Sequence, residues 1–166
     1  MPTHRHPTAL ASAAATALLT AWAVRQETPA EYPERLAGMM RQMDGGEQGA
    51  SLVEMVPDLL RRRLEEVLCA GVLGEAWTGD EAVAGALYCF CRSPEDYRAT
   101  VLPGANTVGD SDSIACIARA ISGAYNGIEA IPQRWRDTVE ASELLRHIAW
   151  DLFDAYQHRA TRPRSE

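Results

Sequence analysis

The sequence predicts an all-α protein, and three observations support this fold class. Apolar residues recur at helical spacing along most of the 166 residues. Proline, glycine and helix-capping residues separate these apolar segments. No segment alternates apolar and polar residues in the way that a half-buried strand does. With 46% hydrophobic and 23% charged residues, the composition is that of a folded globular domain.

The first part of the chain is expected to form three helices. The first should cover residues 8–26, and the second residues 32–43. The second helix should end at Asp44-Gly45-Gly46, because this sequence strongly favours a helix stop. The third should open at Pro57, because proline suits the first turn of a helix.

The middle of the chain is expected to form two helices and a loop. Thr78 and Glu81 have the spacing of a capping box, which predicts a helix over residues 80–91. A short helix should follow from Ser93 to Val101. Residues 102–109 contain proline, asparagine and two glycines, so they are expected to form a loop.

Two strong helices should complete the fold, one beginning near Asp112 and one over residues 141–156. The second of these has an apolar stripe on one face. Its members are Leu144, Leu145, Ile148, Ala149, Leu152 and Phe153. We find no internal repeat and no convincing linker, so the sequence predicts one domain over residues 1–158 and a flexible tail over 159–166.

The net charge and the cysteine spacing argue against two kinds of ligand, nucleic acid and zinc. The formal net charge is −7 and the basic residues do not cluster, which argues against a nucleic-acid ligand. The four cysteines, at positions 69, 89, 91 and 116, lack the paired spacing of a zinc site. Free buried thiols are therefore expected, and they would fit a reducing cytoplasm.

The N-terminal segment allows two interpretations. Basic residues precede the apolar run 9–23, which ends in Ala-Trp-Ala, so the segment imitates a secretory signal. However, the run is rich in Ala, Ser and Thr instead of Leu, which suits a helix packed closely against neighbours. We also expect it to be too short and too mild in hydropathy to cross a membrane.

The acidic cluster Asp110-Ser111-Asp112-Ser113 precedes a helix with a core-facing stripe. This stripe consists of Ile114, Ile117, Ala118, Ile121 and Tyr125. One interpretation is that the cluster caps the helix and complements its dipole. The other is a site for Mg²⁺ or Mn²⁺, because two carboxylates and a hydroxyl gathered at an inner edge repel one another unless a cation lies between them. The spacing does not match a calcium EF-hand loop.

Motifs around this cluster resemble the ADP-ribosylglycohydrolase family, which includes the dinitrogenase reductase-activating glycohydrolases. The motifs are Asn-Thr-Val-Gly-Asp-Ser-Asp-Ser-Ile-Ala from residue 106, Ile-Ser-Gly-Ala-Tyr-Asn-Gly at 121–127 and Ile-Pro-Gln-Arg-Trp at 131–135. Upstream, Glu-Ala-Val-Ala-Gly-Ala-Leu-Tyr-Cys-Phe from residue 81, Ser-Pro-Glu-Asp-Tyr at 93–97 and Thr3-His4 support the match. The resemblance covers almost the whole chain.

The resemblance implies an orthogonal helical domain that hydrolyses the bond between ADP-ribose and a protein acceptor, using two Mg²⁺ or Mn²⁺ ions. By similarity, Asp110, Asp112 and Ser113 would be metal ligands. His4 would contact ADP-ribose, although a surface histidine near a flexible terminus is the simpler interpretation. By the same similarity, Asn106 and Tyr125 lie where they could bind substrate, although loop shaping for the first and core burial for the second are alternatives.

The chain departs from the family pattern in several ways. Ser113 stands where threonine is usual, Val108 replaces a glycine, and Arg119 replaces a small residue. The earlier family motifs, Thr-Asp-Asp-Thr and a glycine-rich phosphate loop, do not occur. We therefore expect the C-terminal, partial form of the fold, with half of a binuclear site that needs a separate N-terminal half for catalysis. The alternative is a non-catalytic helical interaction module or a degenerate fragment.

Overall fold

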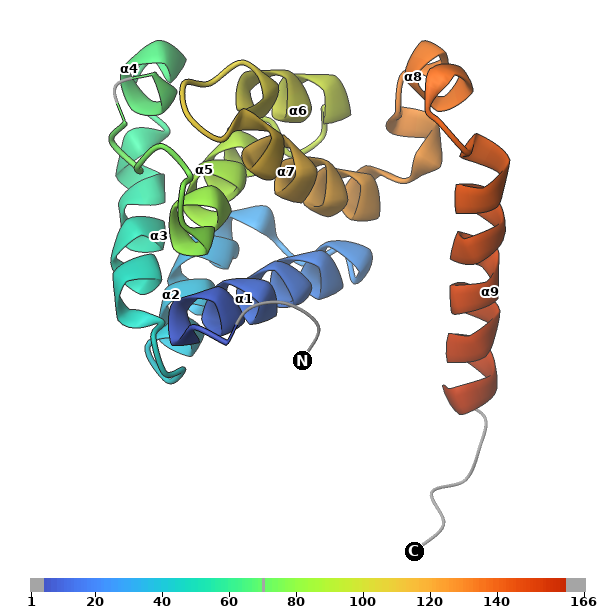
Figure 1. Ribbon diagram of the computed structural model, residues 1–166, viewed down its shortest axis with the longest axis horizontal. Coiled ribbons are helices and arrows are strands. Elements are labelled where there is room, and N and C mark those ends of the chain that lie inside the picture. Colours follow the sequence, from blue (N-terminus) through green and yellow to red (C-terminus); the bar gives the residue numbers. More distant parts are fainter. Residues whose placement is uncertain (1–4, 70, 161–166) are drawn as a thin grey trace, which may run out of the picture. The chain divides into compact units, whose positions relative to one another are not determined.

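The computed structural model describes residues 5–69 and 71–160, and the side chains of those residues except 159 and 160. The described residues contain helices and no strand, which confirms the predicted all-α class. The chain divides into two compact units, residues 1–130 and 131–166. Each unit is described separately below (Figure 1).

Three helices and a short 3₁₀ turn form the first part of unit 1. α1 spans Pro7–Val24 and α2 spans Tyr32–Met40, so both predicted helices are present, and each ends two or three residues earlier than predicted. The 3₁₀ turn Pro29–Glu31 joins them. α3 spans Glu47–Leu59, so the expectation that a helix opens at Pro57 was wrong. Because residues 50, 53 and 56 are fully buried, core packing extends α3 upstream and leaves proline in its last turn.

α5, Gly79–Arg92, is the central helix of unit 1, and α4, Leu64–Leu68, is a short helix before it. Every residue from Ala82 to Phe90 is buried, and α5 contacts α1, α3, α6 and α7 (Figure 1). Thr78 is the N-cap residue, but its side chain makes no capping hydrogen bond. The predicted capping box is therefore absent, although the predicted helix is present.

α6, Tyr97–Ala105, continues into the segment that the sequence predicted as a loop. The Asp96 side chain begins this helix by accepting a hydrogen bond from the Ala99 N–H, at 2.9 Å. Pro103 is within the helix. A Cβ at Gly104 would lie 2.9 Å from Ile114 of α7, so this glycine allows α6 and α7 to pack closely. This packing against α7 stabilises the helical conformation of Pro103 and Gly104, although their local preference is a turn.

Asp80 is a buried carboxylate in the first turn of α5. It is 1% exposed, and neither of its side-chain oxygens has a hydrogen-bond partner in the described structure. Its Cβ lies 3.1 Å from the position that a Cβ on Gly49, in the first turn of α3, would take. The positive ends of two helices therefore lie near the carboxylate, and each contributes about 0.3–1 kcal/mol.

We expect Asp80→Asn to raise the free energy of unfolding by about 1–3 kcal/mol at pH 7. Burying an unpaired carboxylate costs several kcal/mol, which exceeds the contribution of the two helix ends. Urea unfolding measures the change. Asp96→Ala, which removes a capping bond, is the comparison and should lower stability by about 1 kcal/mol. A less stable Asp80→Asn variant would contradict the prediction.

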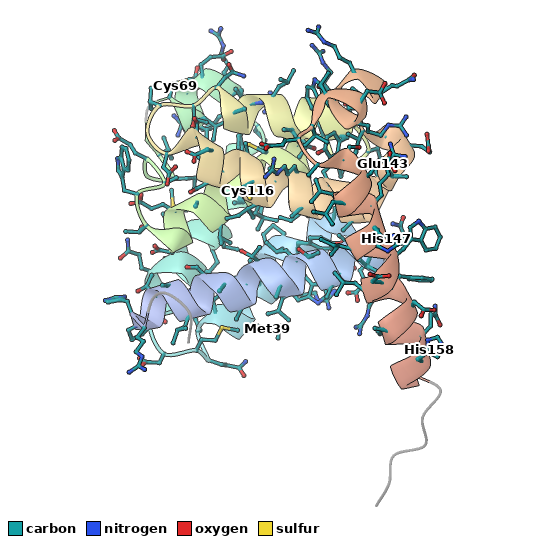
Figure 2. All side chains as sticks on the ribbon, turned by 45° about the vertical axis from the view of Figure 1, so that its right-hand side comes forward. Met39, Cys69, Cys116, Glu143, His147 and His158 are labelled. Atoms are coloured by element: carbon teal, nitrogen blue, oxygen red, sulfur yellow. The ribbon has the colours of Figure 1, made fainter. Side chains whose placement is uncertain are left out.

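The four cysteines are free, as expected, but only part of the set is buried. Cys69 and Cys116 are exposed, so the prediction of burial was wrong for them (Figure 2). Burial raises the pKa of the Cys89 and Cys91 thiols to about 12. Because the thiolate is the nucleophile, these two should react slowly.

We expect iodoacetamide at pH 8 to alkylate Cys69 and Cys116 rapidly and to leave Cys89 and Cys91 unmodified in the folded protein. Mass spectrometry of peptides from a timed reaction would measure the difference. The same reaction in urea should modify all four thiols. Equal rates for the four cysteines under native conditions would contradict the burial described above.

α1 combines a buried side with an exposed apolar side. Its 18 residues have a mean hydropathy of 1.4, so by length and composition alone the helix could cross a membrane, contrary to the expectation from sequence. However, Ala15, Leu19 and Ala23 are fully buried in the core of unit 1. The opposite side exposes Leu10, Ala13, Ala17, Ala21 and Val24.

Unit 2 contains α8, Gln133–Thr138, and α9, Ser142–Ala160. α9 is the last helix that the sequence predicted, and it extends four residues beyond the predicted end. Its large apolar side chains are all exposed. They are Leu144, Leu145, Ile148, Trp150, Leu152, Phe153 and Tyr156.

Candidate functional site

The acidic cluster lies at the start of α7, Ser111–Asn126, on a helix whose inner face is buried. Ile114, Ala118 and Ile121 are buried, which confirms the predicted stripe. Ile114 packs against Gly104 of α6 and also approaches Gly85 of α5, where a Cβ would lie 3.1 Å away. This packing positions the first turn of α7, and with it the cluster.

Asp110, Asp112 and Ser113 lie together at this helix end. Ser113 Oγ donates a hydrogen bond to Asp110 Oδ2 at 2.8 Å. A hydrogen bond between the carboxyl groups of Asp110 and Asp112, and the bond from Ser113, hold the pKa of Asp110 below its usual range. Asp110 occupies the N-cap position, yet its side chain caps no backbone N–H. The Ser113 backbone N–H also lowers the pKa of the Asp110 carboxyl group, so this carboxylate lies both beside its two neighbours and at the positive end of the helix.

A backbone contact joins the cluster to the segment before α5. The Asp110 N–H donates to the carbonyl oxygen of Glu75 at 2.8 Å. Gly109 makes this approach possible, because its φ is +81° and a Cβ there would lie 2.2 Å from the same carbonyl oxygen. The sequence suggested no relation between Glu75 and the cluster, since 35 residues separate Glu75 from Asp110.

Asp112 is exposed, whereas Asp110 and Ser113 are half-buried. Asp112 also lines a pocket of about 270 Å³ beside the helix. Arg119, two turns later and exposed, lines the same pocket. The sequence identified Arg119 only as a departure from the family pattern, and its position in this pocket was missed.

Of the residues predicted to bind substrate, the two that the structure describes, Asn106 and Tyr125, lie outside the cluster. His4 lies outside the described residues. Asn106 is exposed and donates to the Leu102 carbonyl at 2.7 Å, which shapes the end of α6. Tyr125 lies near the other end of α7, about 22 Å along the axis from Asp110 at 1.5 Å per residue. Its ring packs edge-on against Phe90, with 5.5 Å between centroids.

Oxygen donors of the cluster suit a hard divalent cation, but the set is incomplete. Mg²⁺ requires about six oxygen ligands in octahedral geometry. Asp110, Asp112 and Ser113 offer two carboxylates and one hydroxyl. Within residues 5–69 and 71–160, no group of three or more His, Cys, Asp or Glu side chains is placed to hold a metal ion. The cluster alone therefore offers fewer oxygen ligands than a hard divalent cation requires.

Sequence reasoning also missed Trp77. This side chain is 70% exposed, and its indole Nε1–H donates to Glu75 Oε2 at 2.9 Å. Trp77 lines a pocket of about 480 Å³ that extends over α1 and the start of α5 to Ile117 of α7. A tryptophan outside the predicted helices, two residues after a glutamate, was the available signal.

Comparison with known proteins gives a consistent result. The family model for ADP-ribosylglycohydrolase matches residues 1–162. The ADP-ribosylhydrolase ARH3 of Mus musculus is 29% identical over 153 residues, which cover 76% of this chain and 41% of the relative. The Bos taurus protein of the same name is 28% identical over 169 residues, with 85% and 46% coverage. The ADP-ribosylarginine hydrolase Tri1 of Pseudomonas putida is 30% identical over 74 residues, covering 45% of this chain and 20% of Tri1.

The fold is all-α, and the cluster gathers two carboxylates and a hydroxyl at the start of one helix. Together with the match over residues 1–162, they place this chain in the ADP-ribosylglycohydrolase family. The chain spans less than half the length of the relatives described above.

Proposed function

We propose that this chain provides one half of a binuclear Mg²⁺ or Mn²⁺ centre that hydrolyses the glycosidic bond between ADP-ribose and a protein acceptor. The paired carboxylates of Asp110 and Asp112 are the observation that carries the proposal. When bound, the metal ions would polarise ribose hydroxyls and stabilise charge at the anomeric carbon. The partners would be ADP-ribose or an ADP-ribosylated protein, and neither a nucleic acid nor a membrane.

The residues of the cluster have distinct roles in this proposal. Asp110 and Asp112 would be carboxylate ligands, and Ser113 would provide a hydroxyl ligand. The Glu75 carbonyl positions Asp110 through its backbone N–H, so a backbone bond instead of a flexible side chain orients the first ligand.

The missing ligands would come from a polypeptide with the N-terminal half of the family fold. α1 supports this part of the proposal, because Pro7–Val24 contains no charged residue and exposes apolar side chains on one side. Exposed apolar surface of this kind marks sites of contact with other polypeptides. By this proposal, the chain alone binds metal weakly and is inactive.

Reconstitution tests the proposal. Mixing the chain with a recombinant N-terminal half from a family member should give Mg²⁺- or Mn²⁺-dependent release of ADP-ribose from an ADP-ribosylated protein. EDTA should stop the release, and either half alone should give none. If no pairing releases ADP-ribose although the two halves bind each other, the chain is a non-catalytic helical module instead.

A further inference from the structure

An apolar pocket of about 370 Å³ lies in unit 1, where the end of α5 meets the 3₁₀ turn, α3 and α7. Leu60, Cys91 and Tyr125 line it together with four prolines. The members that give this proline pocket its name are Pro29, Pro33, Pro57 and Pro94. Tyr125 lies about 22 Å along α7 from Asp110, so the pocket is separate from the acidic cluster. Its volume is within the range of small-molecule sites, roughly 300–1,000 Å³.

Hydrogen bonds hold the walls of the proline pocket in place. The Asn126 side chain donates to the Pro94 carbonyl at 2.7 Å, which joins the segment before α6 to the end of α7. The Gln26 side chain donates to the Tyr125 carbonyl at 2.6 Å. The Tyr125 ring is fixed in turn by its edge-on packing against Phe90. A ligand would therefore meet walls that are already formed, which reduces the cost of ordering them on binding.

The chemistry of the lining favours an aromatic ring that carries a positive charge. Proline rings pack against aromatic rings where proline-rich segments are recognised, so a wall of prolines suits an aromatic ligand. Glu95 is the one lining residue with a formal charge, and it is exposed and forms no ion pair within residues 5–69 and 71–160. Burial raises the pKa of the Cys91 thiol to about 12, so this thiol stays neutral. The pocket therefore attracts a cation and repels an anion such as a phosphate.

We propose that the proline pocket binds a small aromatic amine, with the ring between the prolines and Tyr125 and the ammonium group beside Glu95. The inference goes beyond the proposed function, because an anionic diphosphate such as ADP-ribose does not suit this lining. Contact with the edge or face of the Tyr125 ring and with Leu60 would fix the ring of the ligand. Because the Glu95 carboxylate is exposed, the charge adds selectivity and the ring supplies most of the affinity.

NMR titration of the whole chain, labelled with ¹⁵N and ¹³C, tests the site without requiring activity. The probes are phenethylamine, phenethyl alcohol and phenylacetate, which share a ring but carry a positive charge, no charge and a negative charge. The amine should bind about twofold to fivefold more tightly than the alcohol, as an exposed ion pair allows, and phenylacetate should bind most weakly. Nuclear Overhauser effects between the ring protons of the amine and the Leu60 methyl groups should locate the ligand.

Three variants separate the contributions. Glu95→Gln keeps the shape of the side chain and removes its charge, so the amine and the alcohol should then bind equally. Ala30→Trp, at an exposed position that lines the pocket, should fill it and abolish saturable binding of both probes. Glu34→Gln is the matched control, because Glu34 is also exposed but lines a different hollow on α2. This control should leave the preference for the amine unchanged.

Several outcomes would overturn the inference. Equal binding of the amine and the alcohol to the unmodified chain, or tightest binding of phenylacetate, would exclude a cation site at Glu95. Binding that survives Ala30→Trp, or the absence of Overhauser effects to Leu60, would exclude the proline pocket. A peptide with adjacent Phe and Lys that binds much more tightly than the amine would replace the small molecule by a partner polypeptide. These measurements involve neither a metal nor release of ADP-ribose, so their failure is distinct from failure of the reconstitution assay.

Discussion

Asp112→Asn is expected to abolish ADP-ribose release in the reconstituted assay, with a loss of at least about 100-fold. Removing a partner outside the ligand shell already costs metal sites about 10-fold to 100-fold, and Asp112 would be a ligand itself. The asparagine side chain has nearly the same size but no charge, so it would bind Mg²⁺ or Mn²⁺ more weakly. Release measured over a metal titration would show the loss.

The same variant should fold normally. Asp112 is exposed, and asparagine has nearly the same size and can still hydrogen-bond to Asp110, so the unfolding midpoint without metal should change little. Asp58→Asn, the same substitution at an exposed position of α3, is the control and should keep full activity. Ser113→Thr should also remain active because it keeps the hydroxyl. Full activity of Asp112→Asn would remove Asp112 from the proposed metal centre.

Gly109→Ala is expected to lower the free energy of unfolding by about 3 kcal/mol or more. The φ of +81° costs a residue with a Cβ about 1–2 kcal/mol. In addition, the new Cβ would lie 2.2 Å from the backbone oxygen of Glu75, so the two segments must move apart. This movement would break the bond from the Asp110 N–H and leave its partner unsatisfied. Urea unfolding measures the change.

Substitutions at two other glycines distinguish the cost of backbone strain from the cost of a steric clash. Gly71 has a φ of +66°, but a Cβ there would meet only Glu75 Cγ, at 3.9 Å. Gly71→Ala should therefore cost about 1 kcal/mol. Gly38 lies in α2 with nothing within 4 Å, so Gly38→Ala should stabilise by about 0.5–1 kcal/mol. If Gly109→Ala costs no more than Gly71→Ala, the close approach of Glu75 is not a constraint.

The helices and the cluster could largely be predicted from sequence because both depend on neighbours along the chain. The recurrence of Ile114, Ala118 and Ile121 predicted α7 and its buried side, and the structure confirms both. The grouping of Asp110 with Ser113 follows from one helical turn, which brings residues three apart together. The extent of α6 was not predictable in this way, because Pro103 and Gly104 favour a turn locally.

By itself, the sequence determined the all-α class, the family resemblance and the closeness of Asp110 and Ser113 at the start of α7. Only the tertiary structure decided that the Glu75 carbonyl holds Asp110, that Ile114 packs against Gly104, and that Asp80 is buried without a hydrogen-bond partner. The physical reason is the same in each case. These contacts join segments that lie far apart in the chain, and their geometry depends on how closely helices can approach, as at Gly104 and Gly109. Hydrophobic periodicity predicts which side of each helix is buried, but it does not predict which other helix packs against that side.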